Sequence, residues 1–166
     1  MRMIRNALAA VGACIAAAAG AAPAGLYNLG DSAVTAAVTA QVITAGVSSQ
    51  GVAQAFISKL EGSSAATIQA NFTYGSGGTT LKVDVETSLD QGTTWVPICR
   101  FAFTTASAEK VANVSGMTPK IAAYTPVTLS DDVCVDGILG DRVRAKVTST
   151  GTYAGNTSIS VRAAVR

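Results

Sequence analysis

The chain has 166 residues, of which 49% are hydrophobic and only 13% charged, and its 12 basic and 10 acidic side chains leave a formal charge of +2. Such a small charge provides no long-range field for strong nucleic-acid binding. Histidine is absent, which excludes Ser-His-Asp, Cys-His and histidine–metal chemistry, because each of these needs an imidazole. The composition fits one globular domain with an additional apolar segment.

The first 25 residues, MRMIRNALAAVGACIAAAAGAAPAG, differ from the rest of the chain. Arg2 and Arg5 precede an Ala-rich apolar run that ends in small residues, which is the layout of a secretory signal with cleavage near Ala22 or Ala24. The alternative is a retained helix or arm, because Ala has a high helix propensity and a neighbouring chain could cover the apolar surface. We assign residues 1–29 to this segment and residues 30–166 to the folded domain.

Two further interpretations of this segment rank lower. Val11-Gly12-Ala13-Cys14 resembles a lipobox, in which Cys14 would be lipidated, but the apolar run before it is short and continues past it. A membrane span is disfavoured because Ala contributes little to insertion and because three residues interrupt the run: Gly12, Gly20 and Pro23.

From about Gly30 onward the apolar residues alternate with a period of two, which predicts β-strands. Within residues 80–88, for example, Leu81, Val83 and Val85 alternate with Lys82, Asp84 and Glu86, the pattern of a strand with one face in water. The clearest strands are predicted over 67–73, 80–88, 142–147 and 158–165, and further strands over 33–44, 53–60, 95–104 and 109–115. Seven or eight such strands predict an all-β protein, an antiparallel β-sandwich of the jelly-roll or immunoglobulin-like type.

Turn signals separate these strands at residues 75–78, 90–92, 136–137 and 151–156. Residues 117–135 contain two prolines and little alternation, so we predict a long irregular connection with room for one short strand.

Residues 88–95, SLDQGTTW, resemble the Asp-box of sialidases, S-x-D-x-G-x-T-W, at every defining position. The matching residues are Ser88, Asp90, Gly92, Thr94 and Trp95. In an Asp-box the Asp accepts backbone hydrogen bonds, the Gly takes a positive φ and the Trp packs below the turn. The resemblance therefore implies a structural hairpin, with glycan binding as the lesser alternative.

Other candidate sites rest on charge and on cysteine. Two acidic groups are considered as a calcium site, and neither has the spacing of a calcium loop. One consists of Asp131, Asp132 and Asp136, and the other of Asp84 and Glu86. We predict neither a metal nor a cofactor. Asp84 and Glu86 could instead form exposed ion pairs across strands, contributing about 0–1 kcal/mol each. The candidate interaction surface for an acidic protein is a basic row formed by Arg142, Arg144, Lys146, Arg162 and Arg166. The alternative is that these residues belong to a solvated strand face.

Cys14, Cys99 and Cys134 are odd in number and lack C-x-x-C spacing, so no zinc site is predicted. A Cys99–Cys134 disulfide remains open as a prediction.

Two longer stretches resemble small structural proteins of tailed-bacteriophage virions. Their sequences are KVDVETSLDQGTTWVPICRFAFTTAS and GILGDRVRAKVTSTGTYAGNTSISVRAAVR. The shared features are the SLDxGxTW hairpin, the GDRVRAKV strand and the closing GTY-G-TSISVR hairpin, within about residues 80–166. The resemblance implies a non-enzymatic subunit of a decoration, collar, neck or tail structure, whose apolar arm is buried against other subunits. The alternative is an exported bacterial β-sandwich, periplasmic or secreted, for carbohydrate binding or surface adhesion. A hydrolase with paired carboxylates is a third class.

Overall fold

The computed structural model describes residues 25–43, 55–119, 121 and 128–166. Within these ranges the regular structure consists of β-strands that pair antiparallel. The predicted N-terminal helix or arm lies outside the described residues, except for residues 25–29. These five residues belong to the first strand, and residues 25–28 pair with the last one. The predicted domain boundary after residue 29 therefore falls inside a strand, because the partner of residues 25–28 comes from the other end of the sequence.

Eight strands have five or more residues: β1 Gly25–Ala33, β2 Val38–Val42, β3 Ala65–Thr73, β5 Thr80–Ser88, β6 Val96–Phe103, β7 Ala108–Ser115, β9 Arg142–Thr150 and β11 Ser158–Val165. Three strands have only two residues: β4 Ser76–Gly77, β8 Val133–Cys134 and β10 Tyr153–Ala154.

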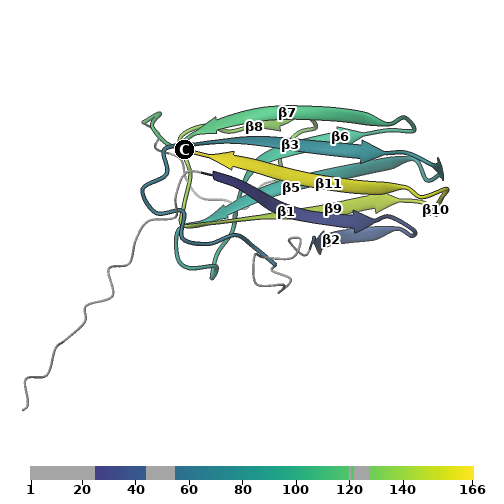
Figure 1. Ribbon diagram of the computed structural model, residues 1–166, viewed down its shortest axis with the longest axis horizontal. Helices are drawn as coiled ribbons and strands as arrows, with labels where there is room; N and C mark the ends of the chain where they lie inside the picture. Colours follow the sequence, from purple (N-terminus) through teal and green to yellow (C-terminus); the bar gives the residue numbers. More distant parts are fainter. Residues whose placement is uncertain (1–24, 44–54, 120, 122–127) are drawn as a thin grey trace, which may run out of the picture.

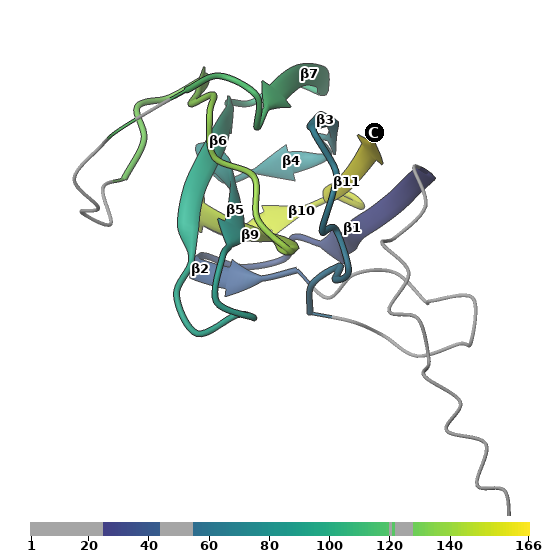
Figure 2. The same ribbon diagram turned by 90° about the vertical axis from the view of Figure 1, so that its left-hand side faces the viewer.

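The long strands form two sheets that face each other (Figures 1 and 2). Sheet A has the order β1-β11-β3-β7, and sheet B has the order β2-β9-β5-β6-β8. The short strands β4 and β10 pair with each other. This all-β, antiparallel architecture is consistent with a β-sandwich.

The hydrophobic core lies between the two sheets. Ile68 and Phe72 of β3 and Leu81, Val83 and Val85 of β5 are fully buried. Each belongs to the apolar half of an alternating pattern, so the period of two in the sequence directly identifies the inner face of each sheet.

Six of the predicted strands are confirmed. Residues 67–73, 80–88, 142–147 and 158–165 lie in β3, β5, β9 and β11, and residues 95–104 and 109–115 largely coincide with β6 and β7. The short strand allowed within residues 117–135 is β8.

Two of the strand predictions are wrong. The single strand expected over 33–44 is divided, because β1 ends at Ala33 in sheet A and β2 begins at Val38 in sheet B. The described part of residues 53–60 forms no strand, and only Ile57 makes an isolated bridge, to Val143. A Val- and Thr-rich composition favours extended backbone but does not determine whether that backbone finds a partner strand.

Two predicted turns meet at one end of the molecule, where β4 pairs with β10. The glycine at position 78 has a φ of +59°, and a Cβ there would lie 2.2 Å from Cζ of Tyr153. The Tyr153 hydroxyl donates a hydrogen bond of 2.6 Å to the carbonyl oxygen of Thr80. Gly78 is therefore required both by the backbone conformation and by the packing of the Tyr153 ring.

Candidate functional site

The SLDQGTTW turn joins β5 to β6 and is held together by its own side chains. The Ser88 hydroxyl donates to Oδ1 of Asp90 (2.9 Å) and accepts from the N–H of Gly92 (2.7 Å). Asp90 also accepts from the N–H (2.7 Å) and the hydroxyl (2.6 Å) of Thr94. These bonds from Thr94 are the main cause that lowers the pKa of Asp90 below its usual value. Because Gly92 has a φ of +91°, the turn has the geometry that the Asp-box resemblance implies.

Trp95 packs against basic and aromatic side chains at the end of this turn. Its indole Nε1 donates to the carbonyl oxygen of Gly92 (3.0 Å), and the Arg144 guanidinium carbon lies 4.1 Å from the ring centroid. The ring of Phe56 is 6.0 Å away, and Arg142 lies over Phe56 at 4.8 Å. A sugar-binding aromatic ring offers a face to its ligand, but here the guanidinium of Arg144 covers one face of the indole.

The charged side chains on the outer face of sheet B form ion pairs across neighbouring strands. Arg100 on β6 donates to both carboxylate oxygens of Asp84, over 2.6 and 2.8 Å. Arg144 on β9 contacts Oε2 of Glu86 at 2.7 Å, and Lys146 pairs with Oε1 of the same carboxylate. We call these five residues the charged ladder.

The water-facing side predicted for β5 is wrong at the two carboxylates of the charged ladder. Asp84 is only 8% exposed and Glu86 only 4%. Part of the cover comes from the segment after residue 127, because Arg100 Nη1 donates to the carbonyl oxygen of Leu129 (2.8 Å). Buried ion pairs of this kind are costly to break, unlike the exposed pairs that the sequence predicted.

A cavity of about 160 Å³ is lined by the charged ladder except Arg144, together with Trp95, Pro97 and Thr128. All four carboxylate oxygens of Asp84 and Glu86 have a cationic partner. Acid–base or nucleophilic chemistry at either carboxylate would first have to break an ion pair, so the cavity is poorly suited to a paired-carboxylate hydrolase.

The predicted basic row does not form one surface. Arg142, Arg144 and Lys146 lie on β9 of sheet B, whereas Arg162 lies on β11 of sheet A. Arg166 follows β11, and its backbone bonds to residues 64 and 65.

Two further cations of the row have an acidic partner of their own. Arg142 pairs with Asp141 (3.3 Å), and Arg162 pairs with Asp31 (2.9 Å) while donating to Asn28 Oδ1. The five positions therefore do not form one continuous basic patch. The row is divided because two strands with the same alternation can belong to opposite sheets.

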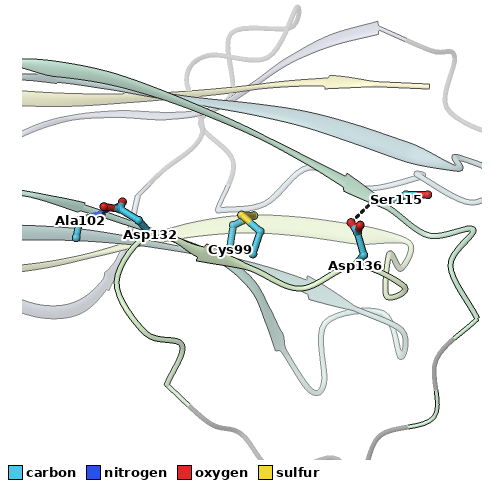
Figure 3. Close-up of a disulfide and its surroundings, with 6 residues drawn as sticks. Cys99, Ala102, Ser115, Asp132 and Asp136 are labelled. Carbon is cyan, nitrogen blue, oxygen red and sulfur yellow. Dashed lines mark hydrogen bonds between the residues drawn. A yellow bond between two sulfur atoms is a disulfide. The ribbon is translucent and has the colours of Figure 1, made fainter.

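The structure contains a disulfide between Cys99 on β6 and Cys134 on β8, with a Cα–Cα distance of 4.0 Å (Figure 3). Two acidic side chains of the same segment also hold it to the sheets. Asp132 Oδ1 accepts from the N–H of Ala102 (3.0 Å), and Asp136 Oδ1 accepts from the N–H of Ser115 (2.9 Å). The segment that carries β8 is thus fixed at three points.

The acidic residues considered for calcium have separate partners. Asp131 pairs with Lys82 (2.7 Å), and Asp132 pairs with Lys110 (2.6 Å). Although burial acts to raise it, the pKa of Asp132 is lowered by the hydrogen bond from Lys110 and by its bond to Ala102. No group of three or more His, Cys, Asp or Glu side chains in the described part of the chain is placed to hold a metal ion.

Searches of protein-family models, curated proteins and solved structures found no match to this chain. Over the residues with described coordinates, no helix is long and apolar enough to cross a membrane.

Sequence reasoning missed two features of this region. The partner of Asp84 is Arg100, which lies opposite it in the β5–β6 pairing. Arg100 belongs to no recognisable sequence motif, so only the pairing of the two strands identifies it. The contact of Phe56 with Arg142 and Trp95 was also missed, because within residues 55–60 only Ile57 forms a β-bridge to a strand.

Proposed function

We propose that this chain is a non-enzymatic structural protein of a tailed-bacteriophage virion with a jelly-roll domain. The observation that supports this most is the strand order. If the eight long strands are numbered one to eight along the chain, sheet A has the order 1-8-3-6 and sheet B the order 2-7-4-5. This is the order of a jelly roll and differs from that of an immunoglobulin domain. Jelly rolls are common in viral capsid proteins, and the sequence resemblance over residues 80–166 favours the same class.

In this proposal the domain is a rigid assembly module that needs no cofactor. Its partners are capsid, neck or tail subunits and further copies of itself. The Ala-rich N-terminal segment is retained as a helix or arm and is buried against neighbouring subunits, because an apolar segment is costly to leave in water. The ion-paired outer face of sheet B supports the rigidity of the domain.

The proposal is tested on purified particles. The protein should co-purify with infectious particles through a density gradient, and mass spectrometry should find its residues 1–24 intact. Localisation by cryo-electron microscopy would then assign it to the head, neck or tail. Absence of the protein from purified particles would refute the proposal.

The Cys99–Cys134 disulfide favours a second candidate, an exported bacterial module for carbohydrate binding or surface adhesion. Disulfides persist mainly in oxidising compartments such as the periplasm, and jelly rolls also include lectins. This candidate predicts cleavage near Ala22 or Ala24, so the intact mass of the native protein distinguishes the two. Binding to a glycan array would support the second candidate directly.

A further inference from the structure

The edge strands of the two sheets differ in how well they are protected against pairing with another chain. β1 is interrupted by a bulge between Asn28 and Gly30, β2 has a register shift between Val38 and Gln41, and β8 has only two residues. Bulges and short strands are common devices that block edge-to-edge association. Over the described residues, β7 is the one edge of these sheets that has neither device. Its eight residues stay in unbroken register with β3 and include no proline. β7 lies at the border of sheet A in Figure 1.

The backbone groups of alternate β7 residues point away from β3. Ser115 shows the direction, because its N–H donates to Asp136 and its carbonyl oxygen accepts from the N–H of Gly137 (2.7 Å). Figure 3 shows Asp136 beside this end of the strand. With a period of two, the N–H and C=O groups of three preceding residues point the same way: Glu109, Val111 and Asn113. No described residue forms a backbone hydrogen bond to these groups.

The side chains of the same three residues are exposed. Val111 is 60% exposed and adds apolar surface in the middle of the strand. A groove of about 310 Å³ runs beside β7 and is lined by Val111, Ala112, Phe101 and Cys134 together with charged side chains. The strand therefore offers both unpaired backbone groups and apolar surface.

Lys110 is a feature of β7 that could oppose pairing, because an inward-pointing charge on an edge strand often prevents it. Its ammonium group, however, donates to the carbonyl oxygen of Ala102 and to Asp132, both over 2.6 Å. It also lies 5.3 Å from the centroid of the Phe103 ring. The charge of Lys110 is thus already satisfied within its own subunit.

We propose that β7 pairs antiparallel with β7 of a second copy of this chain, about a two-fold axis at Val111. In this register Val111 faces Val111 of the second copy, and Glu109 faces Asn113 of the second copy at each side. Each of these three pairs exchanges two backbone hydrogen bonds. The register places no like charges directly opposite each other, and the two four-stranded A sheets become one continuous sheet. The two Lys110 side chains are diagonal neighbours, and each is bonded to Asp132 of its own subunit. Pairing ends near Asn113, because the outward groups of Ser115 are already bonded to residues 136 and 137.

This inference concerns the isolated protein and does not depend on the virion role. Sedimentation equilibrium of the full chain, with varied loading concentration, should show a monomer–dimer equilibrium. The Asn113→Glu variant places a carboxylate opposite Glu109 twice in the dimer, so its dissociation constant should rise about two- to thirtyfold. The matched Asn113→Lys variant creates two attractive pairs and should lower the constant. Adding Glu109→Lys to Asn113→Glu should restore association.

A second pair of variants tests the backbone. Val111→Pro removes the outward N–H without removing a bond to β3, so the protein should stay folded and become monomeric. The control Val111→Thr keeps the N–H and should still dimerise. Circular dichroism and the urea midpoint check that each variant is folded. The proposal is overturned if the wild-type chain is monomeric at its highest soluble concentration. It is also overturned if association is the same in Asn113→Glu and Asn113→Lys, as association through residues 1–24 would require.

Discussion

Reduction of the Cys99–Cys134 disulfide should lower the free energy of unfolding of the β-domain substantially. Cys99 is fully buried in β6, and the bridge links this strand covalently to the segment that carries β8. In the reduced chain, this segment keeps only its noncovalent contacts, among them the bonds of Asp132 and Asp136.

The size of the effect follows from the loop that the disulfide closes. The two cysteines are 35 residues apart in sequence. For a loop of this length, the entropy that the cross-link removes from the unfolded chain corresponds to about 4 kcal/mol at 25 °C. This is a large part of the stability of an ordinary domain, which is about 5–15 kcal/mol.

Urea unfolding with and without reductant measures this difference. The wild-type chain should lose about 4 kcal/mol on reduction, whereas a Cys99→Ala/Cys134→Ala double variant should be insensitive to reductant. A Cys14→Ser variant should behave like the wild type in both conditions. If the wild-type chain lost less than about 1 kcal/mol on reduction, the loop-closure reasoning would be refuted.

Three further predictions concern single side chains. Glu86→Gln leaves two cations of the charged ladder without a carboxylate and should cost about 2–4 kcal/mol in urea unfolding, whereas Asp31→Asn, in an exposed pair, should cost about 0–1 kcal/mol; equal losses would contradict the burial of the ladder. The pKa of Asp90 is lowered from 3.8, so its stabilisation is complete above that pH and is lost as the pH falls through the folded value. Asp90→Asn should therefore unfold at a lower temperature than the wild type at neutral pH, and the gap should narrow in acid; a gap that is independent of pH would contradict this. Gly140→Ala would place a Cβ 1.8 Å from the carbonyl oxygen of Ser88. It should lower the free energy of unfolding, measured with urea, by about 3 kcal/mol, whereas a variant as stable as wild type would show that the two segments separate easily.

Features encoded by near neighbours could be predicted from the sequence. The Asp-box turn is one example, since the hydrogen bonds of Ser88 and Asp90 reach no further than four residues along the chain. The inner faces of β3, β5, β9 and β11 are another, because alternation with a period of two is a local property of extended backbone.

Features that depend on which strands become neighbours could not be predicted. Arg142 and Arg162 follow the same alternation, yet one lies on sheet B and the other on sheet A. Residues 25–29, the first part of β1, were assigned to the N-terminal segment because the partner strand, β11, is at the opposite end of the chain. The carboxylates of Asp84 and Glu86 were expected in water because their cover comes from other strands and from the segment around Leu129.

The local sequence pattern is sufficient to predict that the described part of this chain is all-β, which residues of most strands face inward, and how the turn at residues 88–95 closes. The order of the strands, the burial of the charged ladder and the exposed edge of β7 follow only from the three-dimensional arrangement. The two groups of features differ in the distance along the chain over which they are determined. Backbone conformation and alternation depend on adjacent residues, whereas sheet order and burial depend on the free energy of packing segments that are far apart along the chain.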